Sequence, residues 1–151
     1  MTVSYGDYTR QALDKSYVWF QDANLRMLTS TPAVTREGQV AWFESLPDRR
    51  DYKIWSLLLD SEPIGAFGLK NISESRAEYW GYIGDGDNRG KGYGESMLVF
   101  SEREATDMGI DSLYLKVVFQ NIRAINIYFK RDFMISSTYD GGYVMEKTIV
   151  S

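Results

Sequence analysis

The middle of the chain holds a glycine-rich, basic segment with the composition of a phosphate-binding loop. It lies between a predicted strand and a predicted helix and reads Arg89-Gly90-Lys91-Gly92-Tyr93-Gly94. The first turn of a helix leaves backbone N–H groups unpaired and carries the positive end of the helix dipole. Glycine also lets the backbone come close to a ligand. The segment therefore predicts a diphosphate site; the alternative is a glycine-rich turn before a surface helix.

The spacing of the glycines separates this segment from two common phosphate-binding loops. A Walker loop requires G-x-x-x-x-G-K-[ST], and a dinucleotide fingerprint requires G-x-G-x-x-G near the start of a βαβ unit. Neither pattern occurs here. The segment instead has the pattern R-x-x-G-x-G, carried by Arg89, Gly92 and Gly94.

A second motif follows, and the two motifs together resemble those of the GNAT family of N-acetyltransferases. The motif spans residues 121–133 and reads N-I-R-A-I-N-I-Y-F-K-R-D-F. It is similar to the family pattern N-x-x-A-I-x-x-Y-x-K-x-G-F, and the resemblance covers nearly the whole chain. The departure is Asp132, where the family usually has glycine. Because Asp tolerates positive φ better than most residues, the departure concerns the local turn.

The resemblance implies a GNAT fold, in which a mixed sheet splays beside the glycine-rich loop. It implies acetyl-CoA as co-substrate, with the pantetheine arm in an opening between the strands expected near 77–83 and 113–119. The cofactor-binding residues it implies are Ile83, Arg89, Gly90, Lys91, Gly92, Tyr93, Gly94, Asn121 and Lys130. Asn121 is also a favoured helix N-cap, and Lys130 is alternatively a solvated residue at a helix end.

Tyr128 is the expected general acid. By the resemblance it occupies the position of the tyrosine that faces the sulfur of coenzyme A, where it can assist the departing thiolate. The alternative is a core aromatic residue, because Tyr128 lies between Ile127 and Phe129.

Glu78 is the expected general base. Some family members that acetylate ribosomal proteins carry a glutamate where this chain has Lys116, so their base cannot be transferred to this sequence. Glu78 lies on the preceding strand and can act through water. The alternative for Glu78 is an exposed strand residue beside Arg76. Asp85 and Asp87 are further acidic candidates near the loop.

The composition excludes several kinds of chemistry. The chain has no cysteine and no histidine, which excludes a thiol nucleophile and a Ser-His-Asp triad. No metal site is expected, because these two residues supply most zinc ligands. We therefore expect direct acetyl transfer in a ternary complex.

Charge and hydropathy define the expected surroundings. The net charge is −4 and no basic stripe occurs, so no nucleic-acid partner is expected. No apolar run approaches about 18 residues and no signal peptide is recognisable, so no membrane association and a cytoplasmic location are expected.

The pattern along the chain predicts an α/β (α+β) architecture, a mixed sheet flanked by helices. Strands are expected over 52–59, 64–71, 77–83, 112–119 and 143–149, the first two forming a hairpin with a turn at 60–63. Helices are expected over 15–21, 35–46, 93–108 and 121–130, with Gly109 ending the third. Residues 8–13 are ambiguous and could form a strand, and 22–34 read as an irregular connection. Without a linker or repeat, residues 1–151 are expected to form one domain.

The N-terminal half bears on the choice of acceptor. Residues 19–26 and 35–43 resemble the branch of the family that includes amino-sugar-nucleotide and ribosomal-protein acetyltransferases. Within that branch, residues 63–65 and 70–72 are more similar to enzymes that acetylate a nucleotide-linked 4-amino sugar. Trp55, Trp80 and Tyr82 could stack on a base or sugar, or belong to the core.

Three functions are compatible with these features. The first is an N-acetyltransferase acting on a small-molecule amine, a nucleotide-linked amino sugar. The second is a protein N-terminal acetyltransferase, which a strongly acidic cleft would favour. The third is a CoA-binding module without turnover. A monomer or a homodimer is expected.

Overall fold

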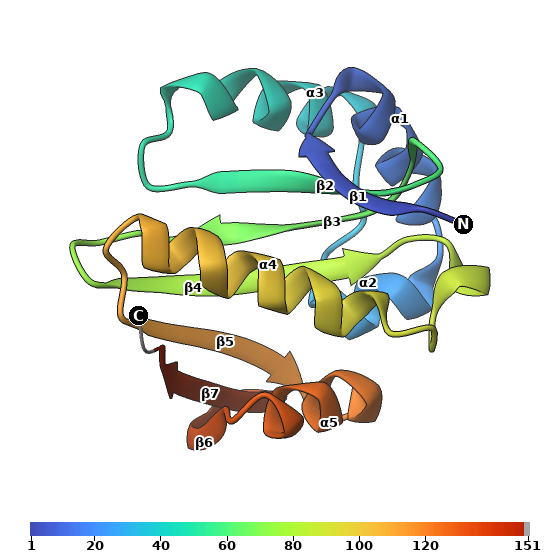
Figure 1. Cartoon of the computed structure of the whole chain (residues 1–151). Helices are drawn as coiled ribbons and strands as arrows, with labels where there is room; N and C mark the ends of the chain where they lie inside the picture. The colour runs from blue at the N-terminus through green and yellow to red at the C-terminus, as the bar shows by residue number, and fades with distance from the viewer. Residues whose placement is uncertain (150–151) are drawn as a thin grey trace.

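Seven strands form one mixed sheet in the order β1-β2-β3-β4-β5-β7-β6 (Figure 1). The computed structural model describes residues 1–149, so the last two residues of the expected 1–151 domain lie outside the described residues. Neighbouring strands are antiparallel except β4 and β5, which are parallel. The strands are β1 (Val3–Asp7), β2 (Lys53–Leu59), β3 (Glu62–Lys70), β4 (Arg76–Ile83), β5 (Ser112–Val118), β6 (Met134–Tyr139) and β7 (Gly142–Thr148). The expected mixed α/β architecture is confirmed.

Helices cover both faces of the sheet. In Figure 1, α4 crosses in front of the sheet and α2 lies behind it. Helix α4 contacts β3, β4 and α5, whereas α1 contacts β3 and α3, and α2 contacts β5. The helices are α1 (Arg10–Trp19), α2 (Ala23–Thr29), α3 (Arg36–Ser45), α4 (Tyr93–Asp107) and α5 (Ile122–Lys130).

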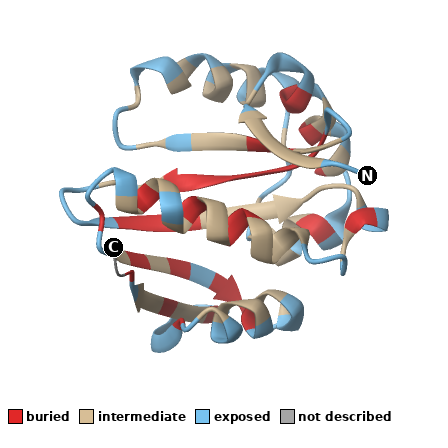
Figure 2. Cartoon of the chain, viewed as in Figure 1, coloured by how far each residue is buried: buried red, intermediate tan, exposed pale blue. Residues whose placement is uncertain are grey.

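Alternation along β4 separates the hydrophobic core from the face that carries the site. Successive strand residues point to opposite faces. Ala77 and Tyr79 belong to the main core cluster together with Met97 and Leu98 of α4. Figure 2 shows this core as the buried residues of β3, β4, β5 and α4. The alternate β4 residues line a cavity on the other face: Glu78, Trp80 and Tyr82.

The predicted β2–β3 hairpin is confirmed, with a tighter turn than expected. Asp60 and Ser61 have φ of +49° and +70°. Positive φ at both central residues is what a type I′ hairpin turn requires, and this turn matches the right-handed twist of the two strands. Glu62 and Pro63 therefore belong to β3 rather than to the turn. The pairing of the two strands shifts its register between Leu57 and Leu58.

The N-terminal segment differs from the prediction. Residues 8–13 do not form a strand, because the Thr9 side chain accepts a hydrogen bond from the Ala12 N–H (3.3 Å) and begins α1. The helix expected over 15–21 thus begins at Arg10. Residues 22–34 are not wholly irregular, since Asp22 accepts from the Asn24 N–H (2.9 Å) and caps the short helix α2.

Two edge strands had no counterpart in the prediction, β1 and β6. Strand β6 is exposed along most of its length and is polar at its centre, so it lacks the apolar alternation that marks a half-buried strand. Just before it, Asp132 adopts φ +71°, the conformation that the glycine of the family pattern would take.

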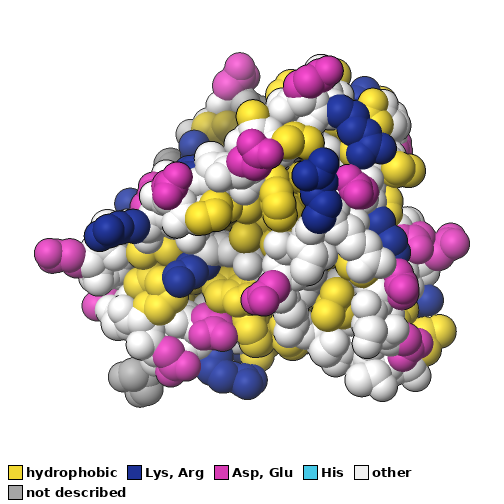
Figure 3. Space-filling view, turned by 90° about the horizontal axis from the view of Figure 1, so that it is seen from above, with side chains coloured by type: hydrophobic (Ala, Val, Ile, Leu, Met, Phe, Trp, Pro, Cys, Tyr) yellow, Lys and Arg dark blue, Asp and Glu magenta, His cyan; other side chains and the backbone are white. Residues whose placement is uncertain are grey.

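The surface carries charges of both signs. Figure 3 shows Lys and Arg side chains scattered among Asp and Glu, with apolar side chains between them. Among residues 1–149, no helix has the length and apolar character needed to cross a bilayer.

Candidate active site

The parallel strands β4 and β5 separate partway along their length. They pair over only three residues each, from Arg76 to Glu78 and from Ser112 to Tyr114. Strand β4 continues to Ile83 and β5 to Val118 without further pairing to one another. The facing backbone groups of these second halves therefore lack a strand partner and need water or a ligand. This opening confirms the expected splay of the sheet and can hold an extended molecule.

The glycine loop, residues 84–92, joins β4 to α4 and leaves the start of that helix open. Gly90 and Gly92 have φ of +77° and +87°. Gly92 is the N-cap of the 15-residue helix α4, and no side chain caps the helix there. A Cβ added at Gly92 would find nothing within 4 Å, so the adjacent space is open. The N–H groups of the first turn, around Tyr93 and Gly94, are thus available to an anion.

Arg89 holds the glycine loop in place. Its guanidinium donates from Nε (3.2 Å) and from Nη2 (3.1 Å) to the carbonyl oxygen of Ile83, the last residue of β4. These two bonds tie the loop back to the strand end. The structure thus gives Arg89 a role in loop geometry, whereas the sequence suggested a charge for a diphosphate.

The basic side chains that lie near the glycine loop differ in part from those expected to bind phosphate. Lys91 is exposed on the loop. Lys130, expected to reach phosphates, instead forms an ion pair with Glu95 (3.0 Å) in the first turn of α4. The guanidinium of Arg123 lies over Gly90, about 3.6 Å from the position of a Cβ there. Sequence reasoning missed Arg123; the available signal was its position in the first turn of the helix opened by Asn121.

Tyr128 and Asn121 of the second motif both line the cavity that Trp80 and Tyr82 of β4 also line. The Asn121 side chain accepts from the Ala124 N–H (3.3 Å) and caps α5. The Tyr128 ring packs edge-on against Tyr79, with centroids 6.3 Å apart. Burial raises the pKa of Tyr128 to about 12. This phenol therefore stays protonated and can donate a hydrogen bond to a ligand.

Glu78 is buried and faces the same cavity. The residue is 6% exposed, which rules out the exposed-residue alternative. Asn71 donates to Oε1 (3.1 Å), and the Lys70 ammonium lies 3.7 Å from Oε2. By contrast, Asp85 is the side-chain cap of a short 3₁₀ turn, residues 86–88, and does not line this cavity.

The cavity has a volume of about 640 Å³ and an aromatic wall. Its rings follow one another around the wall, with centroid distances of 5.7, 6.3, 6.1 and 6.3 Å along the series Tyr8, Trp42, Tyr52, Trp80 and Tyr82. Trp55 stacks on Phe67 in the core instead, with centroids 5.6 Å apart. The aromatic wall thus comes from four different parts of the chain.

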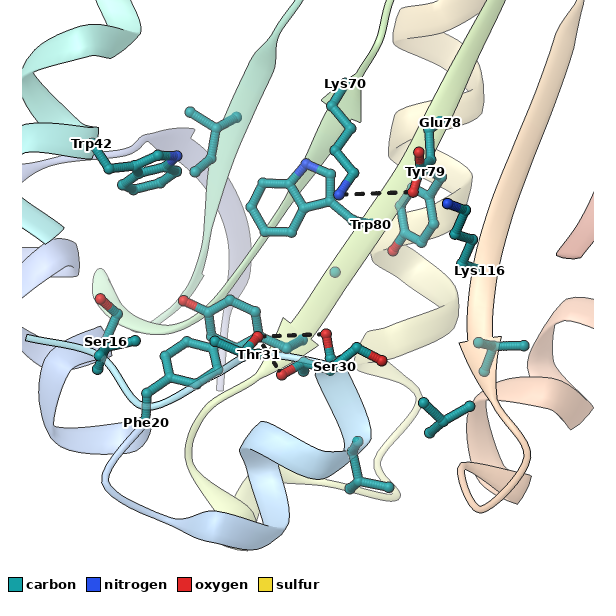
Figure 4. Close-up of a pocket in the computed structure, with 18 of the residues that line it drawn as sticks. Ser16, Phe20, Ser30, Thr31, Trp42, Lys70, Glu78, Tyr79, Trp80 and Lys116 are labelled. Atoms are coloured by element: carbon teal, nitrogen blue, oxygen red, sulfur yellow. Dashed lines mark hydrogen bonds and ion pairs between the residues drawn. The ribbon is translucent and has the colours of Figure 1, made fainter. Parts of the chain in front are cut away.

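Charged side chains gather at one end of this cavity. Figure 4 shows Lys70, Glu78 and Lys116 together there, with Trp42 and Phe20 at the other end. Among residues 1–149, Glu78 is the only acidic residue that lines the cavity. Within residues 1–149, no cluster of three or more acidic side chains could hold a metal ion.

The solved structures most similar in fold include several acetyltransferases. The N-acetyltransferase PseH of Campylobacter jejuni is 17% identical, with a TM-score of 0.77 over 98% of this chain and 99% of that chain. Spermidine N-acetyltransferase from Vibrio cholerae, with CoA and spermine bound, is 14% identical, with a TM-score of 0.86 over 97% and 95%. An aminoglycoside acetyltransferase in complex with coenzyme A is 19% identical, with a TM-score of 0.80 over 97% and 95%. At these identities the similarity shows the fold.

The sequence comparison gives the family. No curated protein matches the chain. Residues 14–133 match the acetyltransferase (GNAT) family, and this range includes both motifs and the strands that form the opening. The chain therefore belongs to the acetyltransferase (GNAT) family and is an acetyl-CoA-dependent N-acetyltransferase.

Proposed function

We propose that this enzyme transfers the acetyl group of acetyl-CoA directly to the amine of a nucleotide-linked amino sugar. The observation that carries the proposal is the lining of the cavity beside the opening: among residues 1–149 it has nine aromatic side chains and a single acidic one. Flat rings offer stacking surfaces to a sugar or a nucleobase. The resemblance of residues 63–65 and 70–72 to amino-sugar-nucleotide acetyltransferases supports the same acceptor.

The glycine loop and the opening fit acetyl-CoA, which supplies an activated acetyl group as a thioester. The N-terminal N–H groups of α4 can bind a diphosphate, and Arg123 and Lys91 add positive charge beside them. The unpaired edge of β4 can hydrogen-bond an extended arm. A backbone N–H on this edge can also stabilise the acyl oxygen as it gains negative charge.

Two side chains are proposed to take part in the chemistry, one as a proton acceptor and one as a hydrogen-bond donor. Glu78 accepts a proton from the acceptor's ammonium group, directly or through water, because only the neutral amine can attack. The Tyr128 hydroxyl donates a hydrogen bond to the sulfur as the thiolate departs. Because burial raises the pKa of Tyr128 to about 12, the phenol keeps this proton across the neutral pH range.

The charge of the cavity argues against polycationic acceptors. Among the structural neighbours are acetyltransferases of spermidine and of aminoglycosides. A site for such amines, or for a basic peptide, needs several acidic side chains. Here the one lining carboxylate already faces Lys70, and Lys116 adds a second positive charge. A protein N-terminal acetyltransferase is less well supported for the same reason.

A mixed-acceptor assay tests the proposal. The enzyme is incubated with acetyl-CoA and an equimolar mixture of nucleotide-linked 4-amino sugars, spermidine, an aminoglycoside and basic peptides. Mass spectrometry then identifies which amine gains the acetyl group. We expect acetylation of an amino-sugar nucleotide; selective acetylation of a polyamine or a peptide would refute the proposed acceptor.

A further inference from the structure

The cavity beside the opening, lined by Glu78, Trp80 and Tyr82 of β4, is called the acceptor cavity below. Its charged end has an excess of positive charge, although the protein as a whole is acidic. The chain carries a net charge of −4, yet the charged residues that line the cavity are Lys70, Lys116 and Glu78. Glu78 and Lys70 face one another at 3.7 Å. Lys116 has no carboxylate within 4.0 Å among residues 1–149. One ammonium group is therefore left without a counter-ion at the wall of the cavity.

The sheet register explains why Lys116 lies there. Glu78 of β4 is paired with Tyr114 of β5, the last pair before the strands separate. Partners in a parallel ladder point to the same face, and so do residues two positions further along each strand. Trp80 and Lys116 thus face the acceptor cavity from the two sides of the opening. Figure 4 shows Lys116 there, on β5, close to Glu78.

We infer that Lys116, assisted by Lys70, binds a phosphate of the acceptor and is a specificity-determining residue of the enzyme. The inference rests on the proposed function, because it takes the acceptor to be a nucleoside diphosphate derivative. The aromatic wall receives the flat ring, and the two ammonium groups receive the diphosphate. In this arrangement Glu78 faces the acceptor's amine.

The chemistry of lysine suits this role. An ammonium group on a flexible stem is a compact point charge with three donors, which binds a phosphate oxygen from many directions. Hydrogen bonds to charged groups contribute more than neutral ones, and the loss of one costs about ten- to a hundredfold in affinity. The same charge repels spermidine and other polyamines, so Lys116 both attracts the acceptor and rejects competitors.

A binding experiment tests the role of Lys116. The enzyme is first saturated with coenzyme A, so that the glycine loop is filled and cannot bind the probes. UDP, dTDP, GDP and CDP are then titrated, each beside its nucleoside, and the fluorescence of Trp42 and Trp80 in the cavity wall reports binding. We expect at least one diphosphate to bind at least tenfold more tightly than its nucleoside. Lys116→Met should remove most of that difference, and Lys116→Arg should retain most of it.

Lys53→Met is the matched control. Lys53 is an exposed strand lysine that does not line the cavity, so its loss should leave diphosphate affinity within about twofold of the wild type. Thermal unfolding of each variant confirms that it is folded. The inference is overturned if no diphosphate binds more tightly than its nucleoside, or if Lys116→Met binds the diphosphate as tightly as the wild type.

The two proposals fail in different ways. If Lys116-dependent diphosphate binding is found but no amino-sugar nucleotide is acetylated, the phosphate site stands and the proposed acceptor is wrong. If an amino-sugar nucleotide is acetylated with a KM that Lys116→Met leaves unchanged, the acceptor stands and the role of Lys116 is wrong.

Discussion

The hydroxyl of Tyr128 is proposed to act as a hydrogen-bond donor, because burial keeps the phenol protonated. Burial raises its pKa to about 12, so the phenol remains protonated at every pH at which the enzyme would normally work. Tyr128→Phe removes the donor but keeps the ring that packs on Tyr79. We expect turnover to fall by roughly ten- to a thousandfold, a loss on the scale of general acid catalysis.

Steady-state kinetics and a separate acetyl-CoA titration check this expectation. The dissociation constant for acetyl-CoA should change little, because the ring and the glycine loop are retained. Unchanged turnover in Tyr128→Phe would remove Tyr128 from the mechanism.

Glu78 is the second residue whose role can be isolated. Its carboxylate is held by Asn71 and faces Lys70. Glu78→Gln keeps an oxygen that can accept from Asn71 but cannot take a proton from the amine. We expect turnover to fall by about a hundredfold or more, as for loss of a general base. The matched control is Glu146→Gln, which removes another carboxylate of the sheet, one paired with Arg76 (2.6 Å) and outside the cavity. Similar losses in both variants would contradict a specific role for Glu78.

The glycine loop and α4 form the element that should bind the diphosphate of acetyl-CoA. Gly92 at the start of α4 and Gly109 just after its end have φ of +87° and +81°, and an added Cβ meets nothing within 4 Å at either position. Alanine is strained to a similar degree at both, by about 1–2 kcal/mol. A comparison of alanine substitutions at Gly92 and Gly109 therefore separates the effect of backbone strain from the effect of lost ligand contact.

We expect Gly92→Ala and Gly109→Ala to lower the free energy of unfolding similarly, while only Gly92→Ala weakens acetyl-CoA binding, by about tenfold. Chemical denaturation and calorimetric titration measure the two effects. Equal acetyl-CoA affinity in both variants would show that the start of α4 is not the diphosphate site.

Elements with strong local signals were predictable, and elements that depend on tertiary contacts were not. The helix after the glycine loop and the β2–β3 hairpin were found, because helical spacing and turn residues mark them. Strand β6 was missed because it is an exposed, polar edge strand that exists by pairing with β7.

The same distinction applies to the candidate site. Their positions in a motif were enough to single out Tyr128 and Asn121, and both residues line the cavity. It could not show that Lys130 pairs with Glu95, that Arg89 binds the end of β4, or that Arg123 lies over Gly90. Those contacts depend on how separate elements pack.

At the scale of the whole molecule, several tyrosines are buried or half-buried. Burial raises the pKa of Tyr8, Tyr52, Tyr79 and Tyr82 above the ordinary tyrosine value, which is about 10. The folded protein keeps these protons at a pH where the unfolded chain releases them. Their contribution to stability is therefore complete below about pH 10 and is lost as the pH rises through the folded-state values.

We expect the free energy of unfolding to fall steeply above about pH 10, by up to about 1.4 kcal/mol per pH unit for each such tyrosine. Urea unfolding at a series of pH values from 8 to 11 measures the slope. Tyr82→Phe should reduce this slope by up to about 1.4 kcal/mol per pH unit, the contribution of one proton. A curve that stays flat to pH 11 would contradict these raised pKa values.

The cavity that is proposed to hold the acceptor is lined by residues from many parts of the chain. Its aromatic wall is built from Tyr8 near the N-terminus, from α3, from Tyr52 just before β2 and from β4. Its charged end comes from β3, β4 and β5. The family membership gives acetyl-CoA as the donor. In the proposed function, the aromatic wall stacks on a flat ring of the acceptor, and Lys70 and Lys116 face its acidic groups.

The most direct test is the rate of coenzyme A thiol release from acetyl-CoA, measured separately with nucleotide-linked amino sugars and with spermidine, aminoglycosides and basic peptides. The cavity lining predicts release with an amino-sugar nucleotide and a kcat/KM at least a hundredfold above that for any polycation. Release that is fastest with a polycation, or absent with every amino-sugar nucleotide while acetyl-CoA still binds, would contradict the proposed acceptor.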